Sequence, residues 1–265
     1  MNERPEPGAA AEAPMAAGGS RALLSVEHLD VRYATVQALF DVSIDVAEGS
    51  VVAVLGANGA GKSTLARSVS GLVPAFAGTV TFGGQDITKW NPHLIRRAGL
   101  VHIPEGRGIF PGLSVQENIR MAVRRVGTSD DRREAMERAY EMFPALTQRR
   151  SQRAGTLSGG EQQMLALARA LAITPRLIIA DEMSLGLAPL VVDFVFETIQ
   201  HAATDGVTIV LIEQFIHRAL ALASECVILR QGSVAWSGPA ADARQEVLDR
   251  YLGEAAEAMS DAGPR

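Results

Sequence analysis

The stretch VVAVLGANGAGKST, residues 51–64, decides the fold of this chain. It begins with a continuous apolar run, which is typical of a central strand in a parallel sheet. The pattern G-x-x-x-x-G-K-[ST] follows over residues 56–63, and helical spacing of apolar residues continues to residue 72. A glycine-rich turn between a buried strand and a helix directs backbone N–H groups and the positive end of the helix at phosphate oxygens. The stretch therefore predicts a loop that binds the phosphates of a nucleotide.

Individual positions of this loop have expected roles. Lys62 is expected to reach the β and γ phosphates, and the hydroxyl of Ser63 to bind Mg²⁺. A turn that only caps a helix is the alternative, but the chain has just two lysines among its 25 basic residues, Lys62 and Lys89, so a chance match is rare. The expected phosphate-binding residues are Gly56, Ala57, Asn58, Gly59, Ala60, Gly61, Lys62, Ser63 and Thr64.

A second stretch, LIIADEMSLGLAP at residues 177–189, places two carboxylates after another buried strand. Carboxylates at the end of such a strand are costly unless a positive charge lies nearby. We expect Asp181 to hold Mg²⁺, through water, and Glu182 to polarise the water that attacks the γ phosphate. The alternative is an exposed pair of acids in a turn.

Composition excludes several classes of protein. The chain has 265 residues, is 47% hydrophobic and carries a net charge of −5, which argues against a protein that mainly neutralises nucleic-acid phosphates. No run approaches the ~18 consecutive apolar residues of a membrane span. The single cysteine, Cys226, rules out an internal disulfide and lies in a strand-like run, so we expect a buried thiol.

The order of predicted elements indicates an α/β protein. Alternating patterns at residues 23–33 and 40–46 predict antiparallel strands, whereas buried strands alternate with helices in most of the remaining chain, which predicts a mainly parallel sheet. A charged helical segment interrupts this order, and Ser114 with Glu117 predicts a capping box at its first helix. We expect one domain over residues 22–253, with a core at 22–104 and 161–253, a helical insertion at about 105–160, and disordered tails at 1–21 and 254–265. A helix is expected at 242–252.

The segment LSGGEQQ, residues 157–163, resembles the signature sequence of ATP-binding cassette (ABC) ATPases. The resemblance extends from residue 23 to about residue 252, and it implies a P-loop NTPase fold with a RecA-like core, an antiparallel β subdomain and an inserted helical subdomain. It also implies that Ser158, Gly159, Gly160 and Glu161 bind the γ phosphate of ATP held by the opposite subunit, at the start of a helix.

Further motifs resemble the shorter cassette subunit of branched-chain amino acid importers. These are IPEGRGIFPGLSVQEN (103–118), DEMSLGLAPL and LIEQ. The resemblance implies that Tyr33 stacks on adenine, that Glu105 contributes to the Mg²⁺ site where most cassettes have glutamine, and that Gln214 stands where most have histidine. Gln214 can hydrogen-bond the γ phosphate but carries no charge, so we expect the site on this chain's own loop to turn over more slowly than the composite site that its signature completes on a paralogous partner. Leu187 replaces a usual aspartate, as is common in this subgroup, whereas Met183 and Phe215 depart even from the subgroup.

The resemblance implies an ATPase that powers uptake of branched-chain amino acids, with ATP and Mg²⁺ as ligands. The implied partners are two membrane-spanning permease subunits, a paralogous cassette or a second copy of this chain, and indirectly an extracytoplasmic solute-binding protein, but no nucleic acid. The implied location is the cytoplasmic face of the cell membrane. We expect Phe110, in the segment 109–115, to be exposed and to dock a membrane subunit. A urea or short-amide importer remains the alternative. A DNA-repair cassette would carry long coiled coils, and a translation-associated cassette protein would carry two cassettes.

Overall fold

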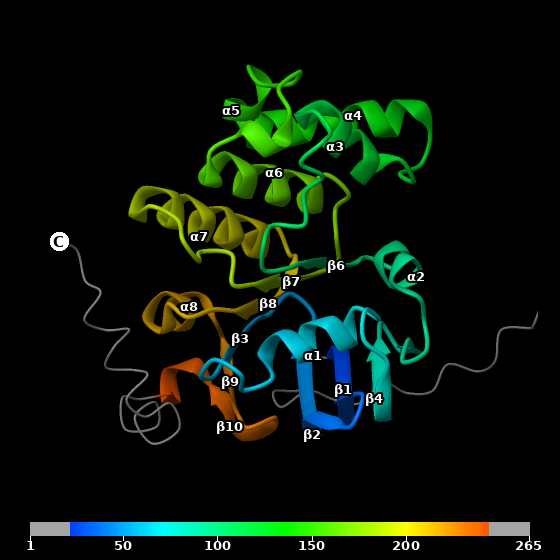
Figure 1. The fold of residues 1–265 in the computed structure, drawn as a ribbon, viewed down its shortest axis with the longest axis vertical. Coiled ribbons are helices and arrows are strands. Elements are labelled where there is room, and N and C mark those ends of the chain that lie inside the picture. The colour runs from blue at the N-terminus through cyan, green and yellow to red at the C-terminus, as the bar shows by residue number, and fades with distance from the viewer. Residues whose placement is uncertain (1–21, 244–265) are drawn as a thin grey trace, which may run out of the picture.

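A computed structural model describes residues 22–243, and these form two sheets with a group of helices at one end (Figure 1). The predicted tails at 1–21 and 254–265, and nearly all of the predicted terminal helix, lie outside the described residues. No helix of the described residues is both long and apolar enough to cross a membrane.

The larger sheet has six strands in the order β10-β9-β3-β8-β7-β6. Five of them are parallel, namely β3 (Val51–Leu55), β6 (Leu100–Ile103), β7 (Leu177–Asp181), β8 (Thr208–Ile212) and β9 (Glu225–Arg230). Every residue of β3, β7 and β8 is buried, as expected for strands covered on both faces. The edge strand β10 (Ser233–Pro239) runs antiparallel to β9. This arrangement confirms the predicted α/β class.

The smaller sheet is antiparallel, in the order β2-β1-β4-β5. Its strands are β1 (Ala22–Tyr33), β2 (Val36–Ala47), β4 (Ala75–Phe82) and β5 (Gln85–Asp86). Helix α1 (Lys62–Val69) lies between the two sheets, and its buried residues Leu65, Ala66 and Val69 share one hydrophobic core with both (Figure 1). The helix that follows the phosphate loop is therefore fixed from two sides.

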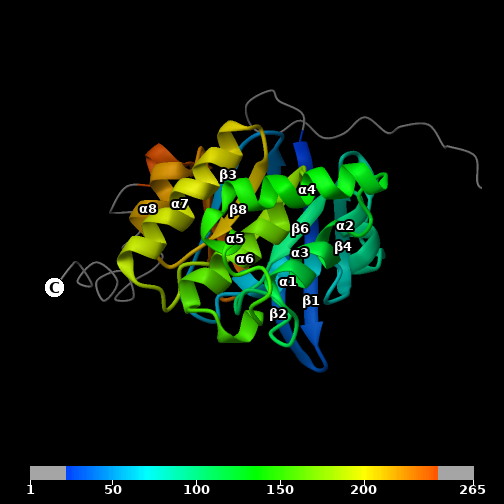
Figure 2. The same cartoon turned by 90° about the horizontal axis from the view of Figure 1, so that it is seen from above.

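The remaining helices are α2 (Pro92–Arg97), α3 (Val115–Val123), α4 (Ser129–Met142), α5 (Pro144–Thr147), α6 (Gly159–Leu171), α7 (Pro189–Thr204) and α8 (Ile216–Leu222). Of these, α2 shares the hydrophobic core of α1, whereas α3 to α8 cover the other face of the large sheet and extend beyond it. Helices α3, α4 and α5 lie between β6 and β7 in the chain and form the end of the molecule opposite the antiparallel sheet (Figures 1 and 2). The predicted capping box of Ser114 and Glu117 starts α3.

Register in the large sheet determines where polar residues gather. Val54 of β3 and Asp181 of β7 both pair with Ile212 of β8, so these three strands end level with one another. Because the strands are parallel, the segments that follow them emerge at one edge of the sheet. The phosphate loop, Glu182 and Gln214 are therefore neighbours, although the sequence separates them widely.

Candidate active site

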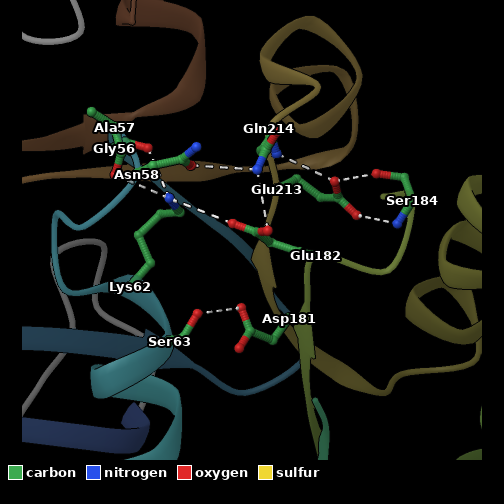
Figure 3. A network of polar contacts seen from close by, with 10 residues as sticks. All are labelled: Gly56, Ala57, Asn58, Lys62, Ser63, Asp181, Glu182, Ser184, Glu213 and Gln214. Carbon is green, nitrogen blue, oxygen red and sulfur yellow. Dashed lines mark hydrogen bonds and ion pairs between the residues drawn. The ribbon is translucent and has the colours of Figure 1, made fainter. Parts of the chain in front are cut away.

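Lys62 points toward the carbonyl groups of the phosphate loop on one side and toward Glu182 on the other (Figure 3). Its Nζ donates hydrogen bonds to the carbonyl oxygens of Gly56 (2.9 Å) and Ala57 (3.3 Å), and lies 3.7 Å from Glu182 Oε1. The side chain is only 4% exposed, so this ammonium group depends on those oxygens for its solvation. Gly61, just before it, has φ of 105°, and a Cβ there would come within 2.6 Å of Leu39 Cδ2. Glycine is therefore required at the turn that starts α1.

Asp181 and Ser63 form a second polar pair below the lysine. Ser63 Oγ donates to Asp181 Oδ1 at 3.2 Å, whereas Oδ2 is buried and has no hydrogen-bond partner in the described structure. The nearest ring nitrogen, His102 Nε2, lies 3.9 Å from Oδ2, beyond hydrogen-bonding distance. A hydroxyl beside a carboxylate with an unpartnered oxygen is the kind of donor set that Mg²⁺ prefers, so these residues fit a magnesium ion.

Glu182 is held by contacts from three segments. Its backbone N–H donates to the carbonyl of Ile212 at 2.8 Å, and its φ is 48°, in the left-handed region that only a few per cent of non-glycine residues adopt. Gln214 Nε2 donates to Glu182 Oε2 at 3.1 Å and lies 3.4 Å from Asn58 Oδ1 (Figure 3). The carboxylate of Glu182, just after β7, is thus contacted by Lys62 from the phosphate loop and by Gln214 from the segment after β8.

Glu213 and Ser184 form a buried pair behind this carboxylate that sequence analysis did not identify. Ser184 donates to Glu213 through its backbone N–H at 3.2 Å and also through its hydroxyl, and Glu213 is 2% exposed. Burial raises the pKa of Glu213 to about 7, with a small contribution from the charge of Glu182, although the bonds from Ser184 and the Gln214 N–H oppose the shift. An acid directly after an apolar strand was the available signal, the same one that pointed to Asp181.

A cleft of about 820 Å³ opens beside these groups. Its walls include predicted residues from the phosphate loop together with Glu105, Glu182 and Gln214. Val36 and Phe40 of β2 also line the cleft, but Tyr33 does not, although it is 41% exposed at the end of β1. The sequence pattern gave no reason to select Phe40. The lining residues from the loop are Asn58, Gly59, Gly61, Lys62, Ser63 and Thr64.

The signature segment lies apart from this cleft, since none of Ser158, Gly159, Gly160 and Glu161 lines it. Ser158 instead starts α6 with a capping box, in which its side chain accepts from the Glu161 N–H and Glu161 accepts from the Ser158 N–H at 2.9 Å. Arg149 Nε lies 2.6 Å from Glu161, and the Ser158 bond lowers the pKa of that carboxyl. The structure does not bring the two predicted phosphate-binding segments of one chain together.

Four further side chains singled out in the sequence can be placed in the structure. Phe110 is 42% exposed, as predicted, and Cys226 is fully buried, with burial raising the pKa of its thiol to about 12. Met183 is 3% exposed and packs in the core cluster on the helical side of the sheet, so an apolar side chain there serves packing. Phe215 is 40% exposed at the start of α8, and nothing in the structure explains it.

The glycine-rich loop, the carboxylates at the ends of neighbouring parallel strands and the inserted helices define a P-loop nucleotide hydrolase. A family model described as ABC transporter matches residues 39–184. The high-affinity branched-chain amino acid transport ATP-binding protein BraG of Pseudomonas aeruginosa is 41% identical over 233 residues, 87% of this chain and 100% of the relative. LivF of Archaeoglobus fulgidus, a probable branched-chain amino acid transport ATP-binding protein, is 36% identical over 82% of this chain and 92% of its own length.

Among solved structures, the ATP binding subunit of an ABC transporter superposes with a TM-score of 0.77 at 28% identity, covering 90% of this chain and 99% of that one. The chain belongs to the ABC transporter family and is one of its ATP-hydrolysing cassettes.

Proposed function

We propose that this chain is the ATP-hydrolysing subunit of an importer of branched-chain amino acids, placed on the cytoplasmic face of the cell membrane. The observation that carries the activity is the meeting of Lys62, Glu182 and Gln214 at one edge of the sheet, beside Ser63 and Asp181. The substrate class rests on the two relatives named for branched-chain amino acid transport, one of them matched over its whole length.

In this proposal the triphosphate lies in the cleft beside the loop. The backbone N–H groups of residues 56–64 and the Lys62 ammonium bind the β and γ phosphate oxygens. Ser63, Asp181 and Glu105 hold Mg²⁺, which when bound neutralises charge on those phosphates. Glu105 lines the same cleft as Ser63, and Asp181 offers the unpartnered Oδ2. Adenine is proposed to stack on Tyr33, which is exposed at the end of β1 but outside the cleft lining, and Phe40 adds an apolar wall to the cleft.

Glu182 serves as the group that orients and polarises the attacking water. Its ion pair with Lys62 and its bond from Gln214 Nε2 hold one carboxylate oxygen on each side. When the phosphates take the lysine, the carboxylate is freed toward the γ phosphate while Gln214 still fixes its orientation. The backbone bond to Ile212 prevents the whole residue from moving away.

The signature segment is proposed to complete the site of a second cassette. Ser158 and the N–H groups at the start of α6 lie outside their own chain's cleft, so they are available to the γ phosphate of a partner. The favoured partner is a paralogous cassette, and a second copy of this chain is the alternative. An ATP molecule held between two such surfaces joins them, and hydrolysis separates them.

Two permease subunits are the proposed membrane partners, with the solute-binding protein acting through them. A pocket of about 190 Å³ below the exposed Phe110 supports this, because Arg96, Arg107 and Arg169 line it and no acidic residue of the described chain does. Arg169 lies 4.9 Å from the Phe110 ring, and burial together with Arg96 lowers the pKa of Arg169 to about 10. Such a surface suits a cytoplasmic helix of a membrane subunit.

The test is reconstitution of the complete transporter in vesicles. We expect uptake of leucine, isoleucine and valine that requires ATP and is lost when Glu182→Gln in this chain is combined with the equivalent change in the partner cassette. Uptake of urea or a short amide, without uptake of these amino acids, would select the alternative importer. ATP hydrolysis by the complex without transport of any solute would contradict the proposed role.

A further inference from the structure

A second basic pocket, of about 590 Å³, lies between α3 and α4, away from both the nucleotide cleft and the exposed Phe110. Arginine dominates its walls, and only one acid, Glu137, lines it. The chain as a whole carries a net charge of −5, so this local excess of positive charge runs against the average. The five arginines are Arg120, Arg124, Arg132, Arg133 and Arg150.

Most of these positive charges have no carboxylate partner. Of the five pocket arginines, only Arg133 forms an ion pair within residues 22–243, with Asp130 at 3.4 Å on the exposed side of α4. Arg132 donates hydrogen bonds to the carbonyl oxygens of Val126 and Gly127, at 3.2 and 2.9 Å. These neutral acceptors do not neutralise the positive charge of the guanidinium group. Five guanidinium groups around one pocket that a single carboxylate lines leave an excess of positive charge, which favours a bound anion.

One residue that lines the pocket carries a buried hydrogen-bond donor without a partner in the described structure. Tyr140 is only 6% exposed, lines the pocket, and its hydroxyl has no hydrogen-bond partner in the described structure. The Arg150 guanidinium lies 4.0 Å above its ring. Burial raises the pKa of the Tyr140 hydroxyl, although Arg150 and Arg120 oppose the shift, so the hydroxyl keeps its proton and can donate to an anion. A buried donor left without an acceptor is costly, and an anion in the pocket would remove that cost.

Apolar side chains beside the arginines indicate that the bound anion also has an apolar part. Met121 is 47% exposed and Met136 is half-buried, and both line the same pocket. Helix α3 begins directly after the segment 109–115, which carries the exposed Phe110 proposed to meet the membrane subunits. Arginines beside an exposed methionine, on a helix that continues from the segment proposed to meet the membrane subunits, match an anionic headgroup with the start of its acyl chains.

We propose that the pocket between α3 and α4 binds the phosphate of an anionic membrane lipid, with Arg120 and Arg150 contacting the phosphate and the Tyr140 hydroxyl donating to it. The proposal rests on the proposed function only because that function places the chain beside a membrane. Lipid binding at this pocket fixes the helical end of the cassette against the bilayer without involving the nucleotide.

The test measures binding of the full chain, without ATP, to vesicles of phosphatidylcholine alone and of phosphatidylcholine mixed equally with phosphatidylglycerol, at about 0.15 M salt. We expect binding only to the mixed vesicles. Arg120→Gln combined with Arg150→Gln should weaken it about 30-fold, since each arginine near an anionic surface contributes roughly fivefold. Tyr140→Phe, which removes only the hydroxyl, should weaken it about fivefold. Thermal unfolding checks that each variant is folded.

The matched control combines Arg97→Gln with Arg125→Gln, which removes the same charge from two exposed positions outside the pocket and should cost at most about threefold. Equal losses in the two double variants, with no effect of Tyr140→Phe, would mean diffuse attraction and overturn the site. Absence of vesicle binding, or its abolition by millimolar glycerol phosphate, would overturn the lipid assignment in favour of a protein segment or a soluble anion. Because ATP is absent, neither result depends on whether the proposed ATPase role holds.

Discussion

Two regions of the chain are predicted from the sequence to bind phosphate, and they are built in opposite ways. One is the nucleotide site at the carboxyl ends of β3, β7 and β8, and the other is the signature segment at residues 157–163. In the nucleotide site, side chains from the phosphate loop and from the segments after β7 and β8 contact one another although they are far apart in the sequence. The Lys62–Glu182 and Gln214–Glu182 contacts are examples. In the signature, Ser158 bonds Glu161 three residues away, and the segment lies outside its own chain's cleft. The first region is a nearly complete chemical site, whereas the second is a surface prepared for another molecule.

The largest effect should come from Glu182→Gln, which keeps the shape but removes the charge that polarises water. We expect turnover to fall about 10³-fold while ATP affinity changes little, because the residue acts on the water and not on the nucleotide. Steady-state turnover and equilibrium ATP binding measure the two effects separately. Glu197→Gln, an exposed acid on α7, is the control. A fall in ATP affinity of the same size as the fall in turnover would show that Glu182 holds the nucleotide.

Replacing Glu213 tests whether ionisation of this buried carboxyl lowers the stability of the folded protein. A carboxyl whose folded pKa is about 7, above its ordinary value of 4.5, binds a proton more tightly when folded, so it destabilises the protein as pH rises from about 4.5 to 7. Glu213→Gln should therefore raise the free energy of unfolding by roughly 1–3 kcal/mol at pH 8 relative to its effect at pH 5. Chemical unfolding at the two pH values measures this difference. An equal effect at both would mean that Glu213 titrates normally.

Ser158→Ala tests whether the signature acts on a partner. Loss of the cap should cost about 1 kcal/mol of stability. ATP-dependent pairing with the second cassette should weaken about tenfold, with no change in ATP affinity of the isolated chain. Ser114→Ala removes the equivalent cap of α3 and provides the matched control for stability. If both variants weaken pairing equally, the signature contributes only helix stability.

The smallest effect is expected at Gln214. Gln214→His supplies a group that can carry a positive charge near the γ phosphate, so turnover at this chain's own site should rise a few-fold at pH 6 and return to the parent value above about pH 8. The pH dependence of single-site turnover, measured with the partner's site inactivated, checks this. A constant ratio across that range would exclude a role for the charge.

Local patterns predicted the elements of this fold well. The buried strand at 51–55, the helix after it and the capping box at Ser114 each depend on neighbouring residues, and the structure has all three. Side-chain partners across strands were harder to predict. Glu213 and Ser184 lie 29 residues apart, and His102 approaches Asp181 only because β6 and β7 pair in one register. Phe40 was missed because its position on the cleft follows from the hairpin of β1 and β2.

Binding of ATP by Lys62→Ala, compared with Lys89→Ala, tests the central claim most directly. The chain has only these two lysines, and Lys89 is exposed and outside the cleft, so the pair removes the same charge at two different places. We expect Lys62→Ala to weaken ATP binding at least about 100-fold and to abolish hydrolysis, while Lys89→Ala leaves both unchanged. Equal ATP affinity and hydrolysis in the two variants would contradict it.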